Sequence, residues 1–408
     1  MSMRVLGING LGRIGKLALW RNLAVGHFQR IVINTGREVG KSLNDLASYA
    51  ETDSTYGQLS RYLHGFKGDS MRPVLRVVDP EKGIIMAGDT EIVVLRKARN
   101  PRDIEWHKYD TGVVIDTTGV FTDPSVDPGN LKGALRGHLE GGARKVINSS
   151  AFKLKTNIPV PDDSVTLIYG INHAAYDSGE HNVISAASCT TTALAHMLKP
   201  LLEAPETRRI LTASMSTIHS ATNTQSVLDS VPAAGAGDLR KNRMMLDNII
   251  LTSTNAARAL GSVIPIINDI GFMADSVRIP TSTVSLVTLN LTLQTKIQDD
   301  GESNVTREVV NSIYEKAGNG PQKDLLLYSS EQKVSCDYKG VSAAVVIEGN
   351  DTHTRTAFLT IDGPEFGLDK SIRVPVTHLK IFGWYDNELG SYTCRLIDLA
   401  RYIDEQLA

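Results

Sequence analysis

The sequence has 408 residues, of which 41% are apolar and 22% are charged, and its formal net charge is -2. A chain of this length exceeds a single typical core, so two domains are expected. The small net charge gives no electrostatic case for nucleic acid or an anionic membrane as a partner, and no apolar run approaches the length of a membrane span.

The first part of the chain alternates between strand and helix patterns. The run "RVLGIN" (residues 4–9) predicts a strand, and "KLALWRNLAV" (16–25) has the spacing of a helix. Further strands are predicted at 30–34, 112–119 and 144–150. Alternation of this kind is typical of a parallel, doubly wound sheet.

From Cys189 onward the pattern changes to longer runs that are rich in β-forming residues. These runs cover residues 209–219, 276–295 and 341–349. They favour a second domain with a mostly antiparallel sheet.

Two later segments have sequence patterns that differ from these β-rich runs. Residues 230–243, "SVPAAGAGDLRKNR", are typical of a long loop that ends in basic residues. Near the end of the chain, apolar residues recur at Tyr392, Leu396, Leu399 and Ile403. This spacing predicts an amphipathic closing helix.

The motif "GLGRIG" lies directly between the first predicted strand and the first predicted helix. In a dinucleotide site, Gly10 permits the tight turn, Gly12 lets the backbone approach a pyrophosphate, and Gly15 lets the helix pack on the strand. Alone, the motif also occurs by chance or as a packing turn, but its position here favours the dinucleotide interpretation. The acid expected at the end of the second strand is replaced by Thr35.

A candidate nucleophile stands in the stretch "ISAASCTTTALAHML". Cys189 begins a helical pattern there, where backbone N–H groups and the helix dipole are expected to stabilise a thiolate and lower its pKa. A buried structural cysteine is the alternative interpretation. The chain has three cysteines, too few and too scattered for a disulfide framework or a Cys-rich metal site. A reducing compartment, the cytosol, is therefore expected, and the N-terminal residues show no signal-peptide pattern.

A nucleophilic cysteine also needs a base. His196 lies on the same predicted helix, roughly 10 Å further along its axis, which is too far to reach the thiol. His219 is better placed, because it ends the strand pattern "ASMSTIH" where the chain turns polar.

Taken together, these motifs resemble the glyceraldehyde-3-phosphate dehydrogenase family. The runs "GINGLGRIG", "TTGVFT", "SAASCTT", "STIHSATNTQ", "RIPTSTVSL" and "GWYDNELGSY" occur in the family's order over nearly the whole chain. The resemblance implies an α/β Rossmann dinucleotide-binding domain over 1–188 and an α+β catalytic domain with a mostly antiparallel sheet over 189–387. It also implies a C-terminal helix over 388–408 that returns to the Rossmann domain, and a cytoplasmic homotetramer.

The family's reaction would use Cys189 as nucleophile and His219 as general acid/base, with NAD or NADP as cofactor and no metal. The substrates implied are a small phosphorylated aldehyde and inorganic phosphate. The resemblance assigns these residues to the cofactor: Asn9, Gly10, Gly12, Arg13, Ile14, Gly15, Thr35, Arg99, Thr118, Ser149 and Asn387. It assigns Thr222, Thr224 and Arg278 to the substrate phosphate, and Ser188, Thr190, Lys241, Thr254 and Asn255 to the attacking phosphate.

The sequence departs from the family pattern near the attacking phosphate. Thr192 stands where the family has asparagine, Lys241 where an arginine is expected, and Asn255 where it has glycine. Lysine keeps the charge but loses the bidentate geometry of arginine. Residues 123–136 and 335–355 read as insertions.

Three functional interpretations therefore stay open. The first is a phosphorylating glyceraldehyde-3-phosphate dehydrogenase. The second is a dehydrogenase of another phosphorylated aldehyde, such as erythrose 4-phosphate, or one with another acyl acceptor. The third is a non-catalytic binding paralogue, against which the retention of Cys189, His219, Arg278 and Asn387 argues.

The turn "INTGRE" bears on the choice of cofactor. A carboxylate at the position of Thr35 would bind the ribose hydroxyls and repel a 2′-phosphate. Thr35 can offer a hydroxyl but no repelling charge, and Arg37 follows it in the same turn. A guanidinium suits a phosphate, although Arg37 could simply point into solvent. The sequence therefore predicts tolerance of NADP beside NAD.

Overall fold

The computed structural model describes residues 3–155, 158–367 and 369–407. The chain divides into two compact units, Met1–Ser188 with Tyr392–Ala408, and Cys189–Ser391. The domain limits expected from the sequence stay a prediction, and their ends at 1–2 and 408 lie outside the described residues. Within the described ranges no helix is long and apolar enough to cross a membrane.

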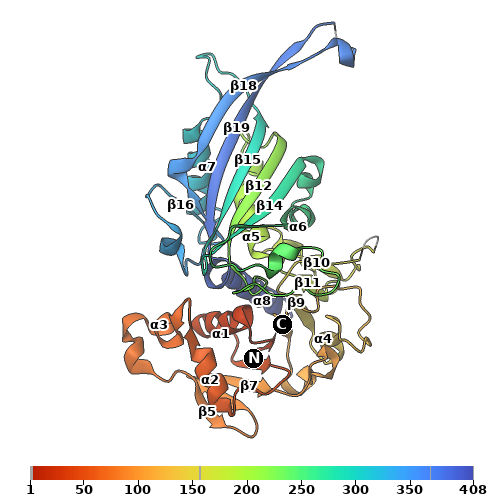
Figure 1. Cartoon of the computed structure of the whole chain (residues 1–408), viewed down its shortest axis with the longest axis vertical. Helices are drawn as coiled ribbons and strands as arrows, with labels where there is room; N and C mark the ends of the chain where they lie inside the picture. The colour runs from red at the N-terminus through yellow and green to blue at the C-terminus, as the bar shows by residue number, and fades with distance from the viewer. Residues whose placement is uncertain (1–2, 156–157, 368, 408) are drawn as a thin grey trace. The chain divides into compact units, whose positions relative to one another are not determined.

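The first unit is built on one large sheet, whose strands run from red to yellow in Figure 1. In pairing order the strands are β10 (Ser164–Thr166), β11 (Val183–Ser185), β9 (Lys145–Asn148), β8 (Val113–Asp116), β1 (Val5–Asn9), β2 (Arg30–Asn34), β7 (Thr90–Leu95), β6 (Ile84–Ala87) and β5 (Arg76–Asp79). All pairs from β10 to β7 are parallel, and only the edge formed by β7, β6 and β5 is antiparallel. The predicted doubly wound sheet is confirmed.

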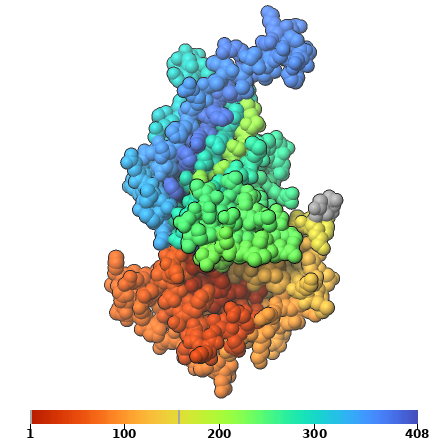
Figure 2. Space-filling view, in the orientation of Figure 1, coloured from red at the N-terminus to blue at the C-terminus, as the bar shows by residue number. Residues whose placement is uncertain are grey.

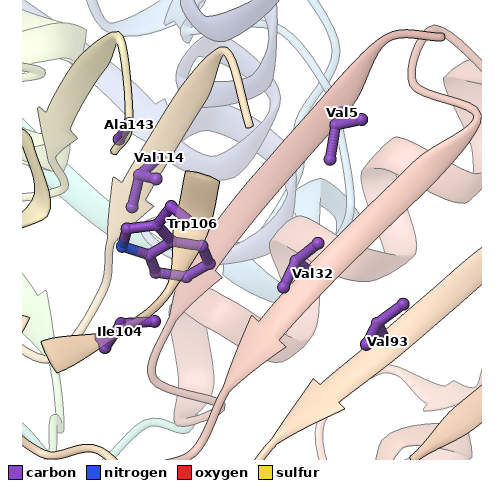
Figure 3. Close-up of a cluster of buried hydrophobic side chains, with 7 residues drawn as sticks. All are labelled: Val5, Val32, Val93, Ile104, Trp106, Val114 and Ala143. Atoms are coloured by element: carbon purple, nitrogen blue, oxygen red, sulfur yellow. The ribbon is translucent and has the colours of Figure 1, made fainter. Parts of the chain in front are cut away.

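The central strands of this sheet are apolar because both of their faces are covered. Every residue of β1, β8 and β9 is buried, as expected for parallel strands between two layers. One buried cluster surrounds Trp106, whose indole lies beside Ile104 and Val114 (Figure 3).

Five α-helices and a short hairpin complete the described part of the first unit. They are α1 (Arg13–Val25), α2 (Leu43–Glu51), β3 (Thr52–Asp53), β4 (Gly57–Gln58), α3 (Leu59–His64), α4 (Gly137–Glu140) and α8 (Cys394–Glu405). Helix α8 packs on α1. Its apolar face buries Leu396, Leu399 and Ile403, and Tyr392 is buried just before it, so the predicted closing helix is confirmed.

The second unit holds a mixed sheet with helices α5 (Cys189–Glu203), α6 (Ala256–Val263) and α7 (Arg307–Asn319). In pairing order its strands are β13 (Ile250–Thr252), β14 (Gly271–Ile279), β12 (Ile210–Ser220), β15 (Ser285–Gln294), β19 (Ile372–Tyr385), β17 (Val345–Glu348) and β16 (Leu326–Ser329), with β18 (His353–Ile361) also paired to β19. Most pairs are antiparallel, and β12–β14 and β16–β17 are parallel. The predicted fold class, a Rossmann-type unit followed by an α+β unit, is confirmed.

One predicted run is divided in the structure. Residues 276–295 form the end of β14 and all of β15, separated by a turn at 280–284. Val284 has a φ of 65° in that turn, which is strained for a β-branched residue. Along β15 the buried positions then alternate with less buried ones, as a half-covered strand requires.

Two surface features of the second unit are visible in the space-filling view (Figure 2). The loop 221–249, in green, lies on the visible face and exposes apolar side chains such as Val231. The β18–β19 ribbon, in blue, projects from the sheet because β18 pairs with β19 beyond the point where β15 ends.

Candidate active site

Cys189 and His219 form a close pair in the second unit. Cys189 is the first residue of α5, and His219 lies near the carboxyl end of β12. The distance from Cys189 Sγ to His219 Nε2 is 3.5 Å. Cys189 is half-buried as a residue, whereas His219 is buried. The pair predicted from the sequence is therefore in contact, while His196 is fully buried within α5.

Arg278 lies directly beside His219, because the two residues are register partners in the parallel pair β12–β14. Arg278 Nη1 contacts His219 Nδ1 and donates to Ser220 O at 3.1 Å. Ser220 O also lies 2.8 Å from His219 Nδ1. The Ser220 carbonyl can only accept and favours a hydrogen on Nδ1, whereas the Arg278 guanidinium can only donate and favours a lone pair there. With the hydrogen on Nδ1, the lone pair of Nε2 faces the thiol.

Burial and the neighbouring guanidinium set the protonation of His219. Burial, followed by the charge of Arg278, lowers the pKa of His219 to about 3, although the Ser220 carbonyl opposes them. The imidazole is therefore neutral at neutral pH. A neutral imidazole with its lone pair toward a thiol can accept that thiol's proton.

The expected lowering of the Cys189 pKa is wrong. Burial raises the pKa of the Cys189 thiol, and this outweighs the opposing contributions of Arg278, the Thr190 hydroxyl and the backbone N–H groups at the start of α5. Cys189 is thus held as a thiol in contact with a neutral base. Attack on an electrophile then requires proton transfer to His219.

Tyr385 is a site residue that sequence reasoning missed. Its fully buried hydroxyl lies 2.9 Å from Thr190 Oγ1 and 2.8 Å from Thr217 Oγ1. Its ring meets that of His219 edge to face, with centroids 6.0 Å apart. Burial raises the pKa of Tyr385, so the phenol stays neutral. The signal was its position inside "GWYDNELGSY", two residues before Asn387.

Asn387 is held by hydroxyl groups that were also missed. Its Oδ1 accepts from Ser220 Oγ at 2.8 Å and from Ser285 Oγ at 3.1 Å. Because these donors occupy the oxygen, the amide orientation is fixed and Nδ2 is turned away from them. Asn387 is thereby oriented to donate a hydrogen bond.

The residues expected to bind the substrate phosphate lie close together in the chain and sheet. Thr222 and Thr224 follow β12, with their hydroxyls 3.0 Å apart, and Gln225 Oε1 accepts from the Thr222 hydroxyl at 3.0 Å. Arg278, on the neighbouring strand, donates to the carbonyl of Ser220, just before this turn.

The residues expected to bind the attacking phosphate are more dispersed. Thr190 contacts Tyr385 in the site, and Ser188 directly precedes Cys189. Thr254 Oγ1 accepts from Ala256 N at 3.2 Å at the start of α6, where Asn255 is the N-cap residue. Lys241 is exposed on the separate turn Leu239–Asn242.

The glycine motif of the first unit has the geometry that a dinucleotide requires. Gly10 has a φ of 94°, and a Cβ on Gly15 would lie 2.1 Å from Gly10 O. A Cβ on Gly12 would meet open space, and the first turn of α1 carries neither an acidic residue nor a side-chain cap. The N–H groups at the start of α1, which include those of Arg13 and Ile14, can therefore receive a pyrophosphate.

The Arg13 side chain has a different partner. Its guanidinium pairs with the buried carboxylate of Asp53, which Lys16 also contacts at 2.8 Å. Hydrogen bonds from Lys16 and Arg13 keep the pKa of Asp53 low in spite of its burial. At Arg13 the contribution to an anion site therefore comes from the backbone.

The remaining predicted cofactor residues lie at the carboxyl ends of the parallel strands. Asn9 and Thr118 both bond the carboxylate of Asp116, and Ser149 N donates to Asp116 O at 3.0 Å. This edge of a parallel sheet is where dinucleotides bind.

The structure of the turn after β2 limits what the Thr35 hydroxyl can offer to a ribose. The Thr35 hydroxyl donates to Arg37 O at 2.7 Å, so it can accept from a ribose but has no second hydrogen to offer. Arg37 is exposed, and exposed Arg99 donates to Gly36 O at 3.2 Å. Two guanidinium groups therefore border this turn.

A parallel sheet with a pyrophosphate-ready turn, together with a cysteine–histidine pair, is typical of dinucleotide-dependent dehydrogenases that act through a covalent thioester. Residues 4–124 match the family model "Glyceraldehyde 3-phosphate dehydrogenase, NAD binding domain", and residues 188–387 match its C-terminal domain. The chain belongs to the glyceraldehyde-3-phosphate dehydrogenase family.

Curated relatives with the same family name are similar to this protein over nearly its whole length. "Glyceraldehyde-3-phosphate dehydrogenase 1" of Bacillus cereus is 35% identical over 402 residues, covering 98% of each protein. The Priestia megaterium enzyme is 32% identical, covering 98% of this chain and 97% of its own. "Glyceraldehyde-3-phosphate dehydrogenase 2" of Streptomyces avermitilis is 32% identical and covers both chains fully.

Proposed function

We propose that this protein oxidises a small phosphorylated aldehyde, glyceraldehyde 3-phosphate, to an acyl phosphate with inorganic phosphate as acyl acceptor. The observation that carries the proposal is the Cys189–His219 pair, with Sγ 3.5 Å from a neutral imidazole. Family membership supports the same reaction. NAD or NADP, when bound, supplies the hydride acceptor.

The first half of the reaction forms and oxidises an adduct on Cys189. As Sγ attacks the aldehyde carbon, His219 Nε2 takes the thiol proton and can return it to the developing oxyanion. The resulting thiohemiacetal loses its carbon-bound hydrogen as hydride, and His219 takes the hydroxyl proton as the thioester forms. Asn387, with its oxygen held by hydroxyl groups, would orient the nicotinamide amide.

The second half regenerates the enzyme. A phosphate oxygen attacks the thioester carbonyl, the C–S bond breaks, and His219 returns a proton to the Cys189 thiolate. Thr190, beside the thiol, and the cation of Lys241 would position the phosphate. Lys241 and Asn255 differ from the family pattern, so another acyl acceptor or another phosphorylated aldehyde is the second candidate function.

The experiment that tests the proposal is a spectrophotometric screen of aldehydes with both cofactors, with and without phosphate. Cofactor reduction that needs glyceraldehyde 3-phosphate and phosphate supports it. Phosphate-independent turnover, or a clear preference for erythrose 4-phosphate, would favour the second candidate. The homotetramer and the cytoplasmic location stay predictions from the family.

We expect Arg278→Ala to impair turnover of the phosphorylated aldehyde far more than that of its unphosphorylated analogue. Loss of a charge-assisted bond to the substrate phosphate should make the difference about 10- to 100-fold in kcat/KM. Arg278 also contacts His219, so the ratio of the two substrates is the informative quantity. Arg355→Ala, an exposed change on β18, serves as control. Equal losses on both substrates would remove Arg278 from the phosphate site.

We propose that the cofactor site accepts NADP as well as NAD. Thr35 presents no charge against a 2′-phosphate, and Arg37 and Arg99 border the same turn. The Thr35→Asp variant is expected to shift preference toward NAD by roughly 1–3 kcal/mol. The measurement is the ratio of kcat/KM with the two cofactors, and Arg37→Ala isolates the contribution of the guanidinium. A wild type that rejects NADP, with a ratio unmoved by Thr35→Asp, would contradict this.

A further inference from the structure

A buried chain of hydrogen bonds runs behind the predicted dinucleotide site of the first unit. It begins at Trp106, whose indole lies in the apolar cluster of Figure 3 and donates to His138 Nδ1 at 3.0 Å. An indole N–H can only donate, so Nδ1 must accept and the ring hydrogen sits on Nε2. His138 Nε2 lies 3.0 Å from Asp116 Oδ2 and therefore donates to it. All three side chains are completely buried.

The Asp116 carboxylate collects four donors at the end of β8. Oδ2 accepts from His138 and, at 2.8 Å, from Asn9 Nδ2. Oδ1 accepts from Thr118 N at 3.0 Å and from Thr118 Oγ1 at 2.6 Å. A buried carboxylate needs this full set of donors, since it has lost its hydration. One buried group thus fixes the residues that end β1 and follow β8.

On the other side of Asp116, hydrogen bonds from two asparagines lead back to the same carboxylate. Because Asn9 Nδ2 donates to Asp116, Asn9 Oδ1 is left to accept from Asn34 Nδ2 at 2.9 Å. Asn34 Nδ2 also donates to Ala98 O at 3.0 Å, and Gly36 N lies 3.4 Å from Asn34 Oδ1. The Asp116 carboxylate, which can only accept, therefore sets the orientation of both asparagine amides, and Trp106 holds His138 as a further donor to it. The path reaches the turns that carry Thr35 and Arg99.

We propose that Trp106, His138, Asp116 and Asn34 are positioning residues for the dinucleotide. Together with Asn9 they form one network, here called the Trp106 network, which ties together the four loops after β1, β2, β7 and β8. The network would meet the cofactor through Asn9, Thr118 and the turn at Thr35, and it fixes their hydrogen-bonding directions before the cofactor binds. The inference rests on the proposed function in that it requires NAD or NADP to bind at this edge.

The test is the affinity of purified protein for NAD, measured by calorimetry, with KM and kcat measured in parallel. Trp106→Phe removes the indole donor together with part of the buried ring, and it frees His138 to change tautomer. It is expected to weaken NAD binding about five- to tenfold, the scale of one or two buried hydrogen bonds. KM for NAD should rise by the same factor, while KM for the aldehyde should stay unchanged, as should kcat at saturating NAD.

Trp20→Phe is the matched control. Trp20 is also fully buried in the first unit, and its Nε1 donates to Ala50 O at 2.7 Å, outside the network. The Trp20→Phe variant should lower the melting temperature about as much as Trp106→Phe does, without changing NAD affinity. Asn34→Ala breaks the network at its other end and should weaken NAD binding comparably, so the proposal stays testable if Trp106→Phe does not fold.

Selective weakening by Trp106→Phe and Asn34→Ala supports the Trp106 network. Unchanged affinity in either folded variant, or an equal loss in Trp20→Phe, would overturn it. A wild type that binds neither NAD nor NADP would instead overturn the proposed function, and with it this inference.

Discussion

Replacing Cys189 by serine is expected to abolish hydride transfer, with a loss of about 10³-fold or more in turnover. Only sulfur at this position can form the thiohemiacetal and the thioester, because a serine hydroxyl beside a neutral imidazole is a much weaker nucleophile. The assay is reduction of the cofactor, followed by absorbance. NAD affinity, measured separately by calorimetry, should change little, since the glycine turn and its neighbours belong to the other compact unit.

The matched control is Cys336→Ser. Cys336 is exposed on the short turn Ser335–Tyr338 of the same unit and should be replaceable without loss of activity. Turnover above a few per cent in the Cys189→Ser variant would remove Cys189 from the chemistry.

For His219→Asn we expect a loss of roughly 10²–10⁴ in kcat/KM, the range for a positioned general acid/base. Asparagine keeps a polar group in the buried site but cannot carry the thiol proton. His378→Asn, an exposed change on β19, should have no such effect. Faster alkylation of Cys189 in the His219→Asn variant would show that His219 does not activate the thiol.

The pH profile of the wild type gives a second measure of His219. Its pKa of about 3 means that the imidazole is neutral, and able to accept a proton, at any higher pH. The pH dependence of kcat/KM reflects the pKa values of groups in the free enzyme. It should therefore show no change caused by titration of His219 between about pH 5 and about pH 8. Alkylation of Cys189 should instead accelerate as pH rises toward the raised pKa of the thiol.

Local sequence patterns predicted the elements that depend on neighbouring residues. The apolar runs of β1, β2, β8 and β9 gave the parallel sheet, and the spacing of Leu396, Leu399 and Ile403 gave the closing helix. The position of Cys189 before a helix and of His219 at a strand end could likewise be interpreted from the sequence, because motif and element coincide.

Other features of the site depend on contacts between residues that are distant in the sequence, and no local pattern contains such contacts. Tyr385 reaches Thr217 because β19 pairs with β15, and β15 in turn with β12, and it reaches Thr190 because α5 packs on β19. The Cys189 pKa was predicted from the helix start alone, yet it is raised mainly by burial, which the helix start does not reveal. For the same reason the partner of Arg13 was not predicted, since Asp53 comes from a separate hairpin.

The closing helix has a consequence for biosynthesis. The first compact unit combines Met1–Ser188 with Tyr392–Ala408, whereas the second is one continuous stretch, Cys189–Ser391. During translation, the residues of the second unit are all made before α8 exists, and α8 buries its apolar side against the first unit. The usual N-terminal-first order of domain completion is thereby reversed. On the ribosome, the dinucleotide-binding unit is begun first and finished last.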